Sequence, residues 1–172
     1  MLFTAFQEWE TQLSWQQCQY SIRWEFRIYT DKLWSMHPSW PNTNNFLITH
    51  SKLVSYANLC GNTFLLILAT CAMYHRTLKY GLCPLSTSGF SALSLVRCAM
   101  NNFQGGKRLA DQAISLLNKF DSNSQLSRTY FISYFMVKSW TMPYVSCLKF
   151  LQEGYQVGLQ CGDTDSSSWN IA

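Results

Sequence analysis

The amino-acid sequence predicts an all-α fold of about seven helices, arranged in antiparallel pairs that stack as an α-solenoid. Nearly every apolar stretch repeats with the 3.6-residue period of a helix. Glycines at 61, 81 and 162 end such stretches, and a cap-forming Asn, Ser or Asp follows each of them within a few residues. The corners between helices are short, which favours antiparallel neighbours. A chain of 172 residues with 48% hydrophobic content can bury one sizeable core.

The first 40 residues form an N-terminal aromatic-rich segment in which two periods compete. One helical stripe contains Trp15, Cys18, Ile22, Phe26, Tyr29 and Leu33, and another contains Leu2, Phe6, Trp9 and Leu13. Tyr20 to Ile28 also alternate between apolar and polar side chains, as in a strand. We expect a helix, because a strand needs a partner and no other segment alternates convincingly. A strand over residues 20–28 remains the alternative, and residues 37–42 form a rigid connector.

The remaining residues, 41–172, are expected to form one helical-repeat domain. Its first two helices span residues 46–58 and 63–80, and Gly61 lies between them in a left-handed C-cap. Gly81 and Pro84 mark a similar corner before a helix over residues 85–100. The clearest helix spans Phe103 to Phe120, with apolar residues on one face and polar residues on the other.

Turn-forming residues 121–124 end that helix, so the next one should begin near Ser124 and end before Thr141. Pro143 then opens a helix that reaches Gln160. This helix combines two features: a ridge of large apolar residues, and a seam of glycines that lets a neighbouring backbone approach. The ridge is Leu148, Leu151, Tyr155 and Leu159, and the seam is Gly154, Gly158 and Gly162.

A short last helix should be capped by Asp163 or Thr164 and continue through Trp169. We expect Trp169 and Ile171 to pack against the glycine-rich helix. Two helical turns are marginal in water, and terminal repeats of a stable array usually have a polar outer face. The chain is therefore expected to fray at this end or to self-associate through an uncovered C-terminal repeat.

Motifs that would indicate catalysis or cofactor binding do not fit. A phosphate-binding loop around Gly106-Lys107 would need Gly where Asn101 stands and Ser or Thr where Arg108 stands. The three histidines, His37, His50 and His75, are too far apart in sequence for a local metal-ligand pair. We therefore predict no catalytic, cofactor-binding or metal-binding residues, no cofactor, and no enzymatic activity.

Charge and cysteine content narrow the class of partner. The net charge of +4 is spread along the chain without a basic run, which argues against nucleic-acid binding. The longest apolar stretch, residues 64–73, is too short to cross a bilayer. Seven cysteines without a C-x-x-C pair indicate neither a disulfide framework nor a zinc site, and we expect a cytoplasmic protein. With charged residues at only 13%, apolar surface remains for a protein partner.

Several segments from about Asn45 onward resemble a known type of helical region. They are Leu78-Lys79-Tyr80-Gly81-Leu82-Cys83-Pro84-Leu85-Ser86, Gly89-Phe90-Ser91-Ala92, Gly106-Lys107-Arg108-Leu109-Ala110 with Leu116-Leu117, Arg128-Thr129, Trp140, and residues 151–165. The last of these has the order Gly-Tyr-x-x-Gly-Leu-x-x-Gly-Asp. Together they are similar to the tetratricopeptide-like (TPR-like) helical region of large multidomain signalling proteins of the predicted-ATPase, histidine-kinase or nucleotide-cyclase type.

This resemblance implies a non-catalytic scaffold or protein-interaction segment, a fragment of a signalling ATPase- or kinase-type protein. Its partner would be a peptide or a neighbouring signalling domain. In that family the region carries no catalytic residues, so none is transferred to this chain. Two alternatives stay open: a regulatory piece of an ATP-dependent signal-transduction kinase, and a decayed fragment without function.

Overall fold

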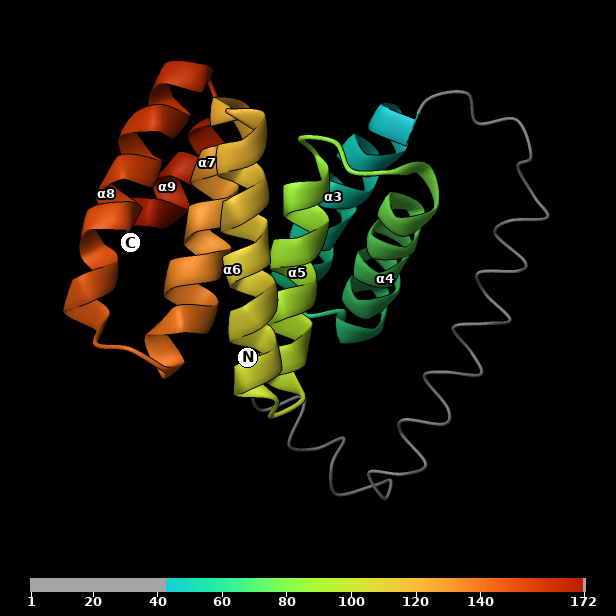
Figure 1. The fold of residues 1–172 in the computed structure, drawn as a ribbon, viewed down its shortest axis with the longest axis horizontal. Coiled ribbons are helices and arrows are strands. Elements are labelled where there is room, and N and C mark those ends of the chain that lie inside the picture. The colour runs from blue at the N-terminus through green and yellow to red at the C-terminus, as the bar shows by residue number, and fades with distance from the viewer. Residues whose placement is uncertain (1–42, 172) are drawn as a thin grey trace. The chain divides into compact units, whose positions relative to one another are not determined.

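The structure, a computed structural model, describes residues 43–171 of the chain. Over that range it contains seven α-helices, one π-helix and one 3-10 segment, and no strand (Figure 1). The all-helical prediction is therefore confirmed for these residues. The segment at residues 20–28 and the connector at residues 37–42 lie outside the described residues. Along 43–171, none of the helices combines the length and apolarity that crossing a bilayer requires.

The chain divides into two compact units, residues 1–72 and 73–172, and the boundary falls inside a helix. In the first unit, α3 (Thr43–Leu59) is followed by the first half of α4 (Thr63–Tyr80). Gly61 has a φ of 68°, which confirms the left-handed corner. Asn62 then caps α4, because its Oδ1 accepts a hydrogen bond from the Leu65 N–H at 3.0 Å. Buried apolar residues of this unit are Leu47, Ala57, Leu66 and Ala69.

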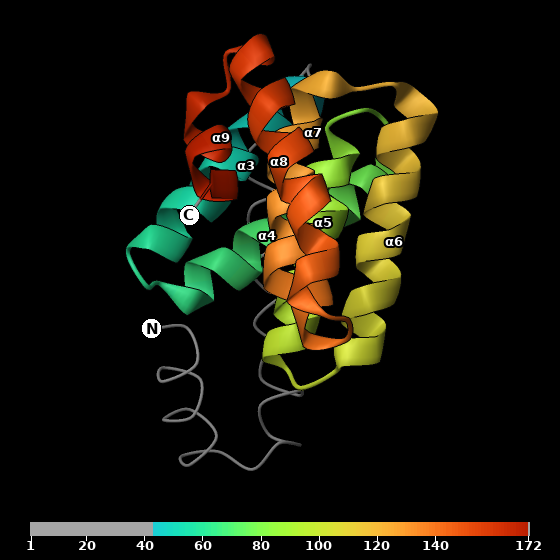
Figure 2. The same ribbon diagram turned by 90° about the vertical axis from the view of Figure 1, so that its left-hand side faces the viewer.

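The second unit continues with a closely packed helix pair, α5 (Ser86–Ala99) and α6 (Phe103–Phe120). Gly106 permits their approach, since a Cβ there would lie 2.9 Å from the Ser94 carbonyl oxygen and would also meet the Cys98 sulfur. Figures 1 and 2 show the two helices side by side and joined by a tight corner. Asn102 caps α6 by accepting a hydrogen bond from the Gly105 N–H at 2.9 Å.

The third helical stretch changes its winding midway. It begins as α7 (Asn123–Tyr130), widens into the π-helix η1 (Phe131–Val137) and tightens into the 3-10 segment η2 (Lys138–Trp140). The predicted start near Ser124 and end before Thr141 are both correct. The change of winding was not predicted, because apolar periodicity reports which face is buried and not which carbonyl each N–H reaches.

The last two helices are α8 (Tyr144–Cys161) and α9 (Thr164–Ile171), separated by Gly162 with a φ of 76°. The α7–η1 stretch, α8 and α9 pack against one another, and α8 runs antiparallel to both of its neighbours (Figure 1). One core cluster joins α6, α7, η1 and α8. It contains Leu117, Leu126, Tyr130, Tyr134, Cys147 and Leu151.

Candidate interaction surface

The seat of α9 is built from glycines and small polar residues. A Cβ on Gly158 would lie 2.6 Å from the Ser127 Oγ of α7 and would also meet the Ser167 Oγ of α9. One turn earlier, a Cβ on Gly154 would lie 2.8 Å from the Asn170 Oδ1. The two glycines therefore let α8 approach both neighbours, as the sequence predicted for the seam. The third glycine, Gly162, instead ends the helix.

Asn170 connects α9 to α7. Its Nδ2 donates to the Ser127 carbonyl oxygen at 3.0 Å, to the Ser127 Oγ at 3.1 Å and to the Ser166 carbonyl oxygen at 2.8 Å. Ser166, Ser167 and Asn170 are all buried. The prediction that Ile171 packs against the glycine-rich helix is wrong, since Ile171 is 67% exposed, whereas Trp169 is half-buried and contacts Phe131 of η1. Close helix approach at glycines leaves room only for small or compact polar partners.

Acidic side chains lie at the beginning of α9. Asp163 caps the helix, because its Oδ1 accepts a hydrogen bond from the Ser166 N–H at 3.3 Å. Burial lowers the pKa of Arg128 on α7, and the carboxylates of Asp163 and Asp165 act in the opposite direction. The guanidinium of Arg128 stays charged at neutral pH because its ordinary pKa is so high.

A second polar cluster surrounds Lys138, where η1 gives way to η2. The Lys138 Nζ lies 2.8 Å from the Asp111 Oδ1 of α6 and 4.5 Å from the centre of the Tyr134 ring. Tyr134 in turn stacks on Phe150 of α8 with ring centres 4.0 Å apart. The lysine side chain is largely buried and Asp111 is about half exposed. The cluster thus ties the π-helix to both α6 and α8.

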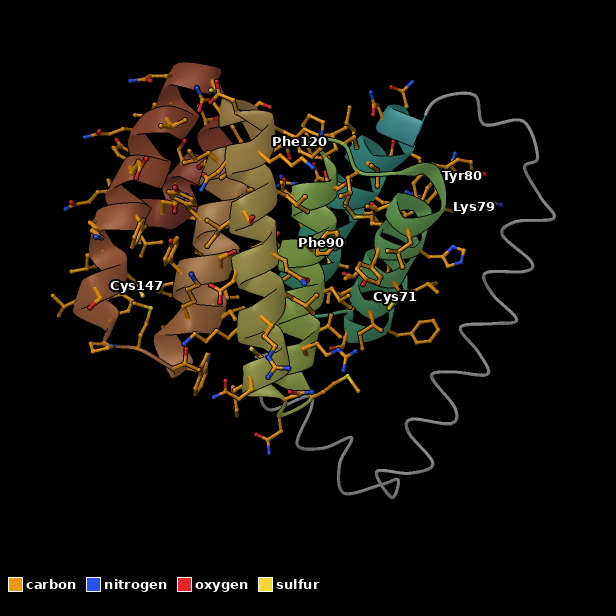
Figure 3. The ribbon with its side chains drawn as sticks, viewed as in Figure 1. Cys71, Lys79, Tyr80, Phe90, Phe120 and Cys147 are labelled. Carbon is orange, nitrogen blue, oxygen red and sulfur yellow. The ribbon has the colours of Figure 1, made fainter. Side chains whose placement is uncertain are left out.

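Tyr134 and Cys147, which pack beside Lys138, both keep their protons at neutral pH. Burial, aided by nearby Tyr130 and Asp111, raises the pKa of Tyr134 to about 12. Burial also raises the pKa of the Cys147 thiol, although Lys138 opposes this. Figure 3 shows Cys147 on the side of α8 that faces η1. A fully buried thiol with a raised pKa is a poor nucleophile, so the cluster acts in packing.

Aromatic rings form a continuous row on the other side of η1. We call Trp169, Phe131, Phe135 and Tyr144 the aromatic row. Successive ring centres are 5.5, 5.3 and 6.1 Å apart. Three of the four rings are half-buried, and Tyr144 is 44% exposed. The row therefore joins α9, η1 and the start of α8 along a partly exposed face.

Helix α8 has a second, exposed apolar stripe beside its buried one. The buried residues are Cys147, Leu151, Gly154 and Gly158. The exposed ones include Tyr144, Val145, Leu148 and Leu159, with Leu148 39% and Leu159 49% exposed. Within the predicted ridge of large residues, Leu151 is buried, Tyr155 is half-buried, and Leu148 and Leu159 are exposed. Gly154 and Gly158 occupy buried positions, and their lack of a side chain lets the neighbouring helices approach closely.

The other features singled out in the sequence have structural places. Residues 104–108 lie in the first turns of α6, where Gly106 is a packing contact with α5. His50 on α3 stacks on Phe46 at 3.7 Å. Across the described part of the chain, no three His, Cys, Asp or Glu side chains are placed to hold a metal ion. Cys98 and Cys147 are buried, Cys71 is half-buried, and Cys60 is exposed at the corner after α3.

The polar contacts that position α9 and η1 were not predicted. Asn170 and Ser127 are 43 positions apart, and Lys138 and Asp111 are 27 apart (138 − 111). Such pairings depend on which helices become neighbours, and no periodicity within one helix reveals them. Comparison with known proteins adds no identification, since no protein-family model, curated protein or solved structure matches this chain.

Proposed function

We propose that this chain is a non-catalytic, TPR-like helical-repeat scaffold that binds a peptide or a neighbouring protein domain. The proposal also includes its origin as a segment of a signalling ATPase- or kinase-type protein acting in the cytoplasm. The observation that carries it is the exposed apolar stripe of α8, at Tyr144, Val145, Leu148 and Leu159. Exposed apolar residues grouped on one face of a packed helix are typical of protein-interaction surfaces.

The helix pairs add support to the repeat interpretation. The α5–α6 pair is closed by Gly106, and the α8–α9 pair is closed by Gly154 and Gly158. Small residues at the contact between paired helices, followed by a left-handed corner, are the features expected of a stacked helical repeat. A helical array of this kind offers its outward faces to partners while its core stays closed.

A peptide selection together with a nucleotide titration would test the proposal. A library of displayed peptides is selected against the purified full chain, and the affinity of the selected peptides is measured by calorimetry. We expect saturable binding in the micromolar range and no heat from Mg-ATP. Specific ATP affinity would instead favour the alternative of a regulatory kinase piece. Failure to select any binding peptide would leave the proposal without support and favour a fragment without function.

A further inference from the structure

Helix α9 covers only part of the face of α8 to which it is bound. It has 8 residues, whereas α8 has 18. The contacts give an antiparallel register, because Ser167 faces Gly158 and Asn170 faces Gly154, nearer the start of α8. Within the described residues, α9 therefore ends about halfway along its partner. The first half of α8 lies directly ahead of the end of α9.

That region is apolar and continuous with the seat of α9. The aromatic row begins at Trp169 of α9 itself and passes along η1 to Tyr144 of α8. Leu148 lies one turn after Tyr144, about 40° away around the helix. Tyr144 and Leu148 are 44% and 39% exposed, while Leu151 on the neighbouring stripe of α8 is buried. The apolar surface thus continues in the direction of α9, past its last contact with α8.

Two lysines near α8 point away from this surface. Lys138 reaches Asp111 and the Tyr134 ring, and the Lys149 Nζ lies 4.7 Å from the centre of the Phe150 ring. Phe150 and Tyr134 stack on each other, so both lysines are directed to that pair and not to the aromatic row. The aromatic row and Leu148 contribute only apolar and aromatic side chains, so this surface would be recognised by apolar contact.

We propose that the aromatic row and Leu148 form a docking site for an amphipathic helix of a partner protein. This inference rests on the proposed interaction function and names its site and the chemistry of its partner. The bound helix lies antiparallel to α8 and in line with α9. It presents large apolar residues at i, i+3, i+4 and i+7, with its charged residues turned to solvent. The partner is inferred to be a helix because the site continues the α8–α9 interface, where α9 itself packs on α8 as a helix.

A labelled synthetic helix of about 14 residues would test the site, with Glu–Lys pairs at i, i+4 to maintain helicity. Its leucine and phenylalanine residues follow the spacing given above. A second peptide of identical composition, with the apolar residues dispersed around the helix, is the ligand control. Binding to the full chain is measured by fluorescence anisotropy.

Two single substitutions on the same half of α8 complete the design. Leu148→Glu places a charge on the docking site. Ser146→Glu adds the same charge at an exposed position about 160° away around the helix. Both positions are exposed, so both variants should fold, and their melting temperatures check this.

The amphipathic peptide should bind the wild-type chain and the Ser146→Glu variant with similar affinity. Leu148→Glu should lower the affinity for this peptide about tenfold or more, because binding would then remove water from the new carboxylate. Equal affinity for Leu148→Glu and wild type would overturn the site, as would equal binding of the dispersed peptide. If library peptides bind but this probe does not, the site fails and the scaffold function stands. Dimerisation abolished by Leu148→Glu, without peptide binding, would identify a second copy as the occupant and overturn the inference.

Discussion

Gly158 and Asn170 position α9 through opposite properties. Gly158 contributes the absence of a side chain, which brings α8 against Ser127 and Ser167. Asn170 contributes three hydrogen bonds from one buried amide group. Together they replace the large apolar contacts that usually join helices. Residue-scale substitutions should therefore separate packing from hydrogen bonding.

Gly158→Leu should destabilise the chain much more than Gln156→Leu. The new side chain would overlap Ser127 and Ser167, and overpacking of this kind costs about 1–3 kcal/mol or more. Gln156 is exposed on the same helix, and its substitution should change the free energy of unfolding by less than about 0.5 kcal/mol. Thermal unfolding of both variants gives the comparison. Equal melting temperatures would show that the glycine seam is not a packing face.

Asn170→Ala should destabilise the chain by about 1–3 kcal/mol, because it removes the buried amide that donates to the Ser127 Oγ and carbonyl oxygen. Ser168→Ala on the same helix is the matched control, since Ser168 is exposed and bonds only within α9. Urea unfolding measures both. If Asn170→Ala unfolds at the same urea concentration as Ser168→Ala, the amide contributes nothing to holding α9.

At the scale of elements, the positions of the helices could be predicted from the sequence, but the way they pack could be predicted only in part. The predicted limits of residues 63–80 and 103–120 are those of α4 and α6. Apolar period and capping residues determine such limits locally. The seam at Gly154 and Gly158 was predicted as a close contact, but the apolar pattern did not show that Leu148 and Leu159 are exposed. Which side of an amphipathic helix is buried depends on the neighbouring helix, and here α9 offers Ser167 and Asn170.

The π-helix is a second case in which local signals are insufficient. Tyr130 and Tyr134 lie four positions apart and are both buried, and both rings contact Phe150. That spacing fits an α-helix and a π-helix equally well. The ion pair between Lys138, where η1 ends, and Asp111 on α6 holds the widened stretch against α6. The candidate interaction surface, which includes two rings of η1, therefore depends on tertiary contacts.

The pH dependence of stability should report the environment of η1. The pKa of Tyr134 is raised to about 12, so above about pH 10 the unfolded tyrosine loses its proton while the folded one retains it. Unfolding then releases a proton, and stability falls as pH rises from about 10 through 12. The loss attributable to this group is about 2–3 kcal/mol.

Tyr134→Phe removes the ionising hydroxyl while keeping the ring that stacks on Phe150. Its melting temperature should be close to that of the wild type at pH 7 and should fall less steeply above pH 10. Parallel pH profiles for the two proteins would contradict the burial of a neutral phenol at this position.

At the scale of the whole molecule, the second unit combines a closed core with an apolar face that α9 covers only in part. Leu117, Tyr134 and Leu151 lie inside the core cluster, whereas Tyr144 and Leu148 are partly exposed on the adjoining face of α8. Hydrophobic residues of α8 thus both fill the core and form part of the exposed apolar face. This arrangement connects the stability of the unit to what binds it, because any occupant of the exposed face adds to the core that is already present.

A helix appended after Ala172, designed to continue α9 along α8, should stabilise the chain. Leucines at the i, i+3, i+4 and i+7 positions would cover Tyr144, Leu148 and Phe135, and burying these side chains is worth about 1–3 kcal/mol in total. The melting temperature should rise by several degrees, since 1 kcal/mol corresponds to about 2–4 °C at this chain length. The amides of α9 should exchange more slowly with solvent, because the end of this short helix would no longer fray. An extension with glutamine in place of each leucine is the control, and Leu148→Glu should remove most of the gain. If the leucine and glutamine extensions melt at the same temperature, the exposed face of α8 does not accept a helix in line with α9.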